Sequence, residues 1–204
     1  ARWNASLGSN ALEEASRVLI DDDDFVYVAA RFQQSLFFDG DDGGFTSSGG
    51  YDVAVTRYDA SGNRQWTAQF GGAGDDFAQG LAFHPDGTLL MLMSSSAQPG
   101  EQSGPATLIK VSKANGVLLT QEALGFDIES GQETRLAVQP GNGDIVVAGS
   151  VSGPVSVAGA PALAPVSTDT DLFVAKFNES MVPLWGRRFG GTGADALHGV
   201  DIDA

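Results

Sequence analysis

The chain has 204 residues, with 11 lysines and arginines against 26 aspartates and glutamates, and a net charge of −15 at pH 7. This acidic balance argues against nucleic acid or an anionic membrane surface as a partner, because both require positive charge close to phosphates. The absence of cysteine excludes disulfides and thiolate metal sites, and no apolar run approaches the ~20 residues of a membrane helix, so we expect no membrane insertion.

The chain opens with a lone predicted strand, followed by a unit of four short strands. Alternating apolar and polar residues indicate strands, and clusters of Gly, Pro, Asn and Asp between them indicate turns. No stretch has a sustained helical period. In chain order the elements are a lone strand at 2–8, a strand with Val18 and Ile20, an acidic turn at 21–24, an apolar strand at 25–29, a loop at 33–50, a third strand at 52–58, a turn at 59–63 and a fourth strand ending at Phe70 and Gly71.

The same order of strands and turns recurs twice more along the chain. Each unit ends at an apolar residue followed by glycine, and Trp66 and Trp185 stand at the same distance before two of these pairs. Four short antiparallel strands per repeat are the plan of a β-propeller blade. The sequence therefore predicts an all-β fold, in which 1–204 form a single β-propeller segment. Its parts are three complete four-stranded antiparallel blades at about 11–71, 72–125 and 126–190, and lone strands at 2–8 and 196–204.

Two strings in the chain resemble the SBBP-type β-propeller repeat. They are YDVAVTRYDASGNRQW at 51–66 followed by FGGAGDD at 70–76, and DLFVAKF at 171–177 with Trp185 and FGG at 189–191. That family is found in secreted and surface proteins of bacteria, often ones of unknown function. The resemblance implies a propeller fold and an extracellular or bacterial cell-surface location, but it implies no activity.

Three blades and two lone strands do not fill a closed ring, because known propellers have ~4–8 blades. Lone strands would also expose unpaired edges. We therefore expect the 204 residues to be part of a longer chain that supplies the remaining blades. The alternative is that a second copy of the chain completes the ring.

The loop at 33–50 holds the best candidate metal site, formed by Asp39, Asp41 and Asp42 among glycines. Carboxylates in a loop that can curl around an ion suit calcium, which prefers several oxygen ligands. The spacing departs from the full calcium-loop pattern, and the corresponding loop at 151–168 has no acid. The alternative is that these residues form a solvated acidic loop without an ion. Calcium is therefore the one cofactor that the sequence suggests.

Two further groups of acids have a structural and a functional interpretation. The four aspartates at 21–24 occupy a turn, and a cation could relieve their mutual repulsion. Asp75, Asp76 and Asp195 follow the double-glycine loops. They are expected to accept hydrogen bonds from loop N–H groups, and the alternative is that they line one rim of a ring.

Signatures of catalysis are weak in this sequence. His84 and His198 are its two histidines, and neither stands in a nucleophile motif or at metal-ligand spacing. We therefore expect that the protein is not an enzyme, and we assign no catalytic residue. Four residues near the start of successive first strands are candidates for lining a central channel, where two arginines could hold an anion such as an acidic sugar. They are Arg17, Gln79, Arg135 and His198.

The expected function is that of a non-enzymatic, secreted or cell-surface binding or structural module, whose ligand is a protein or a carbohydrate. One alternative is a propeller enzyme with its active site in the central channel, acting on carbohydrate or of the quinoprotein type, whose tryptophan-docking motif resembles residues 60–66. The other is a calcium-stabilised adhesive repeat.

Overall fold

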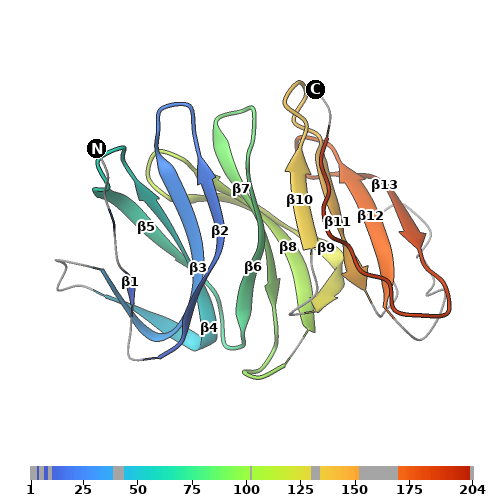
Figure 1. The fold of residues 1–204 in the computed structure, drawn as a ribbon, viewed down its shortest axis with the longest axis horizontal. Coiled ribbons are helices and arrows are strands. Elements are labelled where there is room, and N and C mark those ends of the chain that lie inside the picture. The colour runs from blue at the N-terminus through green and yellow to red at the C-terminus, as the bar shows by residue number, and fades with distance from the viewer. Residues whose placement is uncertain are drawn as a thin grey trace.

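The computed structural model describes residues 4, 7–8, 11–38, 44–101, 103–129, 134–151 and 170–202. Within these residues there are strands and turns but no α-helix, and hence no helix that could cross a membrane. The all-β prediction is confirmed. The strands form three antiparallel sheets, which we number 1 to 3 in chain order. The sheets stand side by side, and sheet 2 lies between sheets 1 and 3 (Figure 1).

Each sheet is an antiparallel meander whose four main strands follow one another along the chain. In sheet 1 the short strand β1 is added at the far end of β3. The strands of sheet 1 are β1 (Leu7–Gly8), β2 (Glu13–Ile20), β3 (Val26–Phe38), β4 (Phe45–Tyr58) and β5 (Arg64–Phe70). Those of sheet 2 are β6 (Asp76–Phe83), β7 (Thr88–Ser95), β8 (Ser103–Ser112) and β9 (Leu118–Glu129). Those of sheet 3 are β10 (Thr134–Val138), β11 (Ile145–Val151), β12 (Asp171–Phe177) and β13 (Pro183–Phe189).

The segment 33–50, predicted as a loop, is largely a continuation of β3 and β4. Ser35 pairs with Thr46, and Leu36 pairs with Phe45. Leu36 and Phe38 join Phe32 in a small apolar cluster on sheet 1. The glycines of this segment favoured a loop prediction, but its apolar residues also recur at a period of two, and their burial extends the hairpin.

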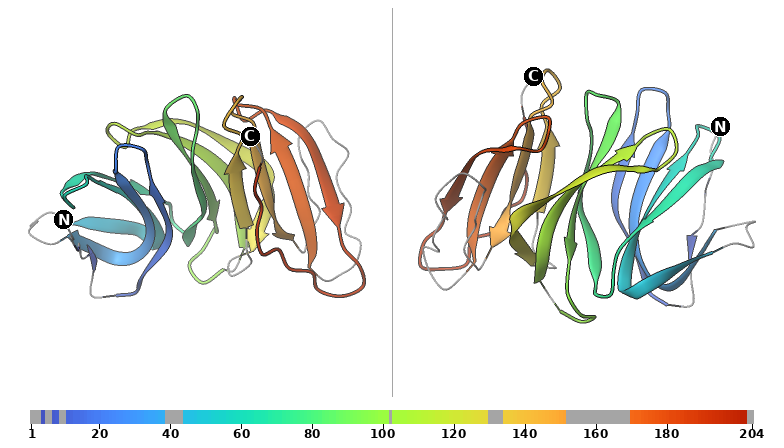
Figure 2. Two further views of the ribbon diagram at one scale, coloured as in Figure 1. Left: turned by 45° about the horizontal axis from the view of Figure 1, so that its top comes forward. Right: turned by 180° about the vertical axis from the view of Figure 1, so that it is seen from behind.

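The two predicted lone strands have different outcomes. Of the residues 2–8, the pair Leu7–Gly8 is a strand, and it pairs with Phe37 and Phe38 of β3. The prediction of a strand at 196–204 is wrong for 196–202, which belong to no sheet. Strands are held by backbone hydrogen bonds to a neighbouring strand. This segment instead runs back from β13 across sheet 3 and reaches the side of β10 (Figure 2).

The apolar core lies between the sheets, and β7 shows how it is built. Leu89 and Met91 pack toward sheet 1, whereas Leu90 and Leu92 alternate with them and pack toward sheet 3. All four side chains are fully buried. Burying one such side chain stabilises the fold by about 1.5–3 kcal/mol, so the stacking of sheet 2 on both neighbours is a major source of stability.

The first strands of the three sheets approach one another closely, since β6 contacts both β2 and β10. Gly80 of β6 lies directly against β10. A Cβ atom on Gly80 would lie 2.6 Å from the Cβ of Leu136. A register shift next to Gly80 in β6 has a counterpart next to Arg17 in β2, so both first strands carry a bulge at this level.

Trp66 on β5 connects the outer strand of sheet 1 to sheet 2. Its indole Nε1 donates a hydrogen bond of 3.0 Å to the carbonyl of Lys113, in the turn between β8 and β9. Gly116 of the same turn has φ +74°, and a Cβ there would lie 2.7 Å from the Trp66 ring. Glycine therefore meets both the conformation of the turn and the approach of the tryptophan.

Charged residues in the turns join neighbouring sheets. Lys113 of sheet 2 forms an ion pair of 3.0 Å with Asp21 in the turn between β2 and β3. Lys110 of sheet 2 forms an ion pair of 2.9 Å with Asp86 and donates to the carbonyl of Glu179 in sheet 3. The ends of the sheets are thus held by charge-assisted contacts as well as by the core.

Gly80→Ala tests the importance of the close approach between first strands. Alanine would gain about 0.4–1 kcal/mol by restricting the unfolded chain, but crowding against Leu136 is expected to cost about 1–3 kcal/mol. The free energy of unfolding, measured by urea titration, should therefore fall. Gly72→Ala is the matched control, because a Cβ at Gly72 meets nothing within 4 Å. Equal stability of the two variants would contradict the inferred approach.

Candidate functional site

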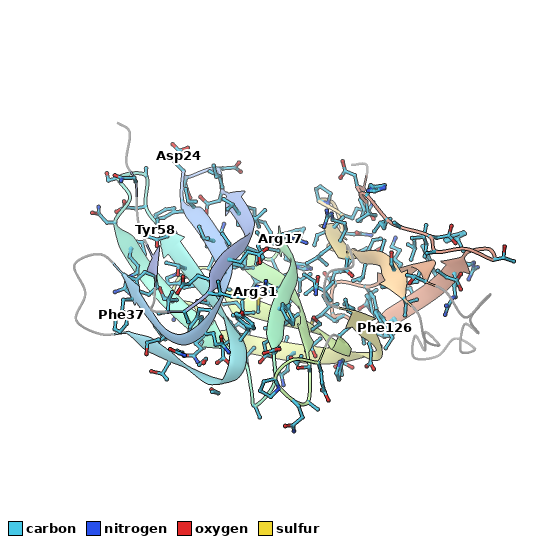
Figure 3. All side chains as sticks on the ribbon, turned by 60° about the horizontal axis from the view of Figure 1, so that its bottom comes forward. Arg17, Asp24, Arg31, Phe37, Tyr58 and Phe126 are labelled. Carbon is cyan, nitrogen blue, oxygen red and sulfur yellow. The ribbon has the colours of Figure 1, made fainter. Side chains whose placement is uncertain are left out.

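Arg17 lies where the first strands of the three sheets meet, near the centre of the molecule (Figure 3). Its Nη1 donates to the carbonyl of Ser16 at 2.6 Å, and its Nη2 donates to the carbonyls of Gln79 in β6 and Thr134 in β10. One guanidinium from sheet 1 therefore binds the main chain of both other sheets. This use exploits the several N–H donors that arginine presents in one plane.

The other candidate channel residues are placed differently. The Gln79 side chain is buried and donates 3.0 Å to the Ser94 hydroxyl within its own sheet. Arg135 is level with Arg17 in the strand register, and its Nη1 donates to the carbonyl of Thr134. His198 is exposed on the segment after β13. The structure therefore brings Arg17, Gln79 and Arg135 to one region.

A second polar region is a group of buried carboxylates where sheet 1 meets the start of β6. It contains Asp52, Asp75 and Asp76, all of which are buried. The Asp75 carboxylate accepts hydrogen bonds from the N–H groups of Tyr51 and Gly100, at 2.9 and 2.7 Å. It therefore joins β4, β6 and the connection after β7.

Burial raises the pKa of Asp76 above its ordinary value, and the neighbouring carboxylates of Asp52 and Asp75 raise it further. Hydrogen bonds from Ser95 and from the N–H of Gly72 act in the opposite direction. Three acids in a region of low solvent access repel one another when all are ionised. The region is thus a local source of electrostatic strain.

Asp52 of sheet 1 and Asp171 of sheet 3 occupy equivalent register positions, and both are fully buried. Asp171 faces Arg188, whose Nε and Nη2 both lie 2.8 Å from its Oδ2. At the position of Arg188, sheet 1 has Gln69, whose Nε2 donates 2.6 Å to Asp52 Oδ2. Asp52 Oδ2 also accepts 3.1 Å from the N–H of Ser48, but these partners are neutral, whereas Asp171 has the Arg188 cation, so the charge of Asp52 is less compensated than that of Asp171.

Of the three acids after the double-glycine loops, two accept the predicted local hydrogen bonds. Asp76 Oδ2 accepts 2.8 Å from the N–H of Gly72, and Asp195 Oδ2 accepts 3.2 Å from the N–H of Gly191. The two loops are therefore closed in the same way. Asp75 instead binds main-chain groups of more distant segments.

The acidic turn at 21–24 is built around Asp21. Burial opposes ionisation of Asp21, but hydrogen bonds from Lys113, Phe25 and Tyr27 outweigh this effect and hold its pKa below the ordinary value. The other three aspartates of the turn are exposed. This geometry supports the turn interpretation over a cation site.

The predicted calcium ligands Asp39, Asp41 and Asp42 lie outside the described residues. Elsewhere, in the part of the chain that the structure describes, no three His, Cys, Asp or Glu side chains are arranged to hold a metal ion.

Sequence analysis missed the network around His84, which is buried in the turn between β6 and β7. Its Nδ1 lies 2.8 Å from Asp86 Oδ1, and its Nε2 lies 3.1 Å from the carbonyl of Gly143 in sheet 3. Burial opposes ionisation of Asp86, but hydrogen bonds from Thr88, Lys110 and His84 hold its pKa well below the ordinary value. The signal in the sequence was Lys110, a charge within an otherwise apolar strand.

Comparison with known proteins adds no relative, since no family model matches the chain and no curated protein matches it.

Gln69→Arg is expected to stabilise the protein by supplying Asp52 with the partner that Asp171 has in sheet 3. Hydrogen bonds to charged groups contribute about 1.5–3 kcal/mol, and the free energy of unfolding at pH 7 should rise by an amount of that order. The reciprocal control is Arg188→Gln, which should cost about 3–5 kcal/mol by leaving a buried carboxylate without its cation. A loss of stability in Gln69→Arg would contradict the equivalence of the two sites.

Asp76→Asn tests the strain among the buried carboxylates. A pKa raised by folding means that the folded state binds the proton more tightly, so stability falls as pH rises from the ordinary value of about 3.9 through the folded pKa. Asparagine keeps an acceptor for the N–H of Gly72 but carries no charge. The variant should therefore be more stable than the parent at pH 7, and this advantage should shrink as pH falls toward 4. Thermal unfolding over this pH range measures the difference, and a constant difference would refute the assignment.

Proposed function

We propose that the chain is a non-enzymatic β-propeller module outside the cell or on the bacterial cell surface. Its role is either to bind a protein or carbohydrate or to serve as a structural module. The observation that carries the proposal is the stacking of three four-stranded sheets, with both faces of sheet 2 buried and the first strands converging at Arg17. Blades of a propeller stack in this manner. The resemblance of residues 51–76 and 171–191 to the SBBP-type repeat supports the location.

A stack of this kind holds its loops on a rigid frame, and rigid frames with variable loops are common recognition surfaces. The turns between first and second strands project at one end of the stack, with the exposed aspartates at 22–24 among them (Figure 1). The connection between β7 and β8 projects at the other end. These two ends are the surfaces that would contact a ligand.

The use of the inner charges supports a scaffold over an enzyme. Arg17 and Arg135 donate to main-chain carbonyls, and Gln79 donates to Ser94. Groups employed in this way stabilise sheet contacts. A catalytic centre would instead aim such donors at the position of a substrate.

The proposal is tested by exposing the immobilised protein to a panel of neutral and acidic polysaccharides and extracellular proteins, followed by mass spectrometry of whatever is retained. We expect retained ligands to be recovered with unchanged mass. Release of cleaved or modified product, lost in His198→Ala, would overturn the non-enzymatic assignment. If nothing in the panel is retained, the binding role fails and the structural role alone stands.

A further inference from the structure

Among the described residues, one face of sheet 3 has no further sheet stacked on it, although Ala148 on this face is fully buried. Antiparallel pairing sets Arg135, Ala148, Val174 and Arg187 opposite one another across the four strands, on the side away from sheet 2. We call this side the free face of sheet 3. It also carries Trp185 and Phe189 of β13, which are 40% and 53% exposed.

In strand register the free face of sheet 3 corresponds to the face of sheet 1 that is buried against sheet 2, with Arg187 in the place of Ala68. Trp185 pairs with Lys176 as Trp66 pairs with Arg57. Trp66 is 9% exposed, because the turn at 112–116 covers it. The difference between the two tryptophans is therefore the presence of a neighbouring sheet.

The segment after β13 occupies the place of a further first strand. Gly191 and Asp195 form the same loop contact as Gly72 and Asp76. Counting on from these loops, residues 196–202 align with 77–83 of β6, and Gly199 falls at the position of Gly80. The segment returns across sheet 3 to the side of β10 (Figure 2), as β6 lies beside β2.

We infer that the free face of sheet 3 is a docking surface for a fourth four-stranded sheet of this same repeat, with residues 196–202 as its first strand. The established contact between sheets 1 and 2 is the template for this interface. The inference rests on the repeat architecture in the proposed function, but it does not depend on the module binding any ligand.

The template also defines the chemistry of the docking sheet. Its second strand would pair with 196–202 and carry apolar residues on the side toward sheet 3, as Leu89 and Met91 do toward sheet 1. Its last turn would need glycine at a positive φ and a carbonyl that accepts from Trp185 Nε1, as at Gly116 and Lys113. Arg135 and Arg187 on the free face suit a sheet as acidic as the rest of the chain.

The opposite end of the stack is already covered in part, which argues against end-to-end joining with a second copy. Phe32, Leu36, Phe38 and Ala54 form an apolar cluster with Phe45 on sheet 1, separate from the core shared with sheet 2. β1 pairs with the end of β3 at the same place.

The test extends the chain by one sheet, with residues 84–129 added directly after Ile202, which aligns with Phe83. Acrylamide quenching of tryptophan fluorescence and Tm are measured in the parent and extended proteins, each with Trp185→Phe and with Trp66→Phe. In the parent, Trp66→Phe should lower Tm and Trp185→Phe should leave it nearly unchanged. In the extended protein, Trp185 should become protected, and Trp185→Phe should lower Tm about as much as Trp66→Phe does.

Two results would overturn the inference. In the first, Trp185 stays accessible in the extended protein and Trp185→Phe remains neutral, while the Tm loss from Trp66→Phe shows that the stack has folded. In the second, the parent sediments as a dimer that Trp185→Phe dissociates, which would assign the free face to a second copy. Neither result depends on ligand retention, so the proposed function and this inference can fail separately.

Discussion

The close approach of the first strands at Gly80 is the constraint on which the stack depends. The side chain of Leu136 fills the space that a Cβ on Gly80 would need, so β6 and β10 approach this closely without strain only while residue 80 is glycine. On the other side of β6, Arg17 donates to the carbonyl of Gln79. With the first strands held together, apolar side chains on both faces of sheet 2 are buried against sheets 1 and 3.

Charge is handled unequally in the repeats, although their strands are nearly equivalent. Sheet 3 matches its buried Asp171 with Arg188, whereas sheet 1 offers Asp52 only the amide of Gln69 and places Asp75 and Asp76 nearby. A buried carboxylate without a cation is destabilising. The region of Asp52, Asp75 and Asp76 between sheets 1 and 2 is therefore less favourable in electrostatic terms than the apolar packing around it, and protonation of Asp76 should relieve part of this repulsion.

The turns supply what the core alone does not specify, namely which sheet sits next to which. Lys113 connects Asp21 and Trp66 of sheet 1 to sheet 2, while His84 and Lys110 connect sheet 2 to Gly143 and Glu179 of sheet 3. These contacts need fixed geometry and matched donors and acceptors, whereas apolar cores tolerate substitutions that keep their volume and pattern. On the free face of sheet 3, Trp185 stands at the position that Trp66 has in sheet 1. It is therefore equivalent to the residue that sheet 1 contributes to its contact with the Lys113 turn.

The sequence by itself determined the strand order, the three units and the turns that contain glycine. The alternation of apolar and polar residues and the turn-forming residues act locally along the chain. The sequence could not distinguish the continued hairpin of 35–46 from a glycine-rich loop, and it predicted a strand at 196–204, whose residues 196–202 pair with no strand in the part of the chain that the structure describes. Only the tertiary structure decided that Arg17 binds the main chain of two other sheets, that Asp52 lacks the cation given to Asp171, and that Trp66 is covered while Trp185 is not. These outcomes depend on which side chains the stacking brings together from distant parts of the chain, and spacing within one strand carries no record of the sheet that lies against it.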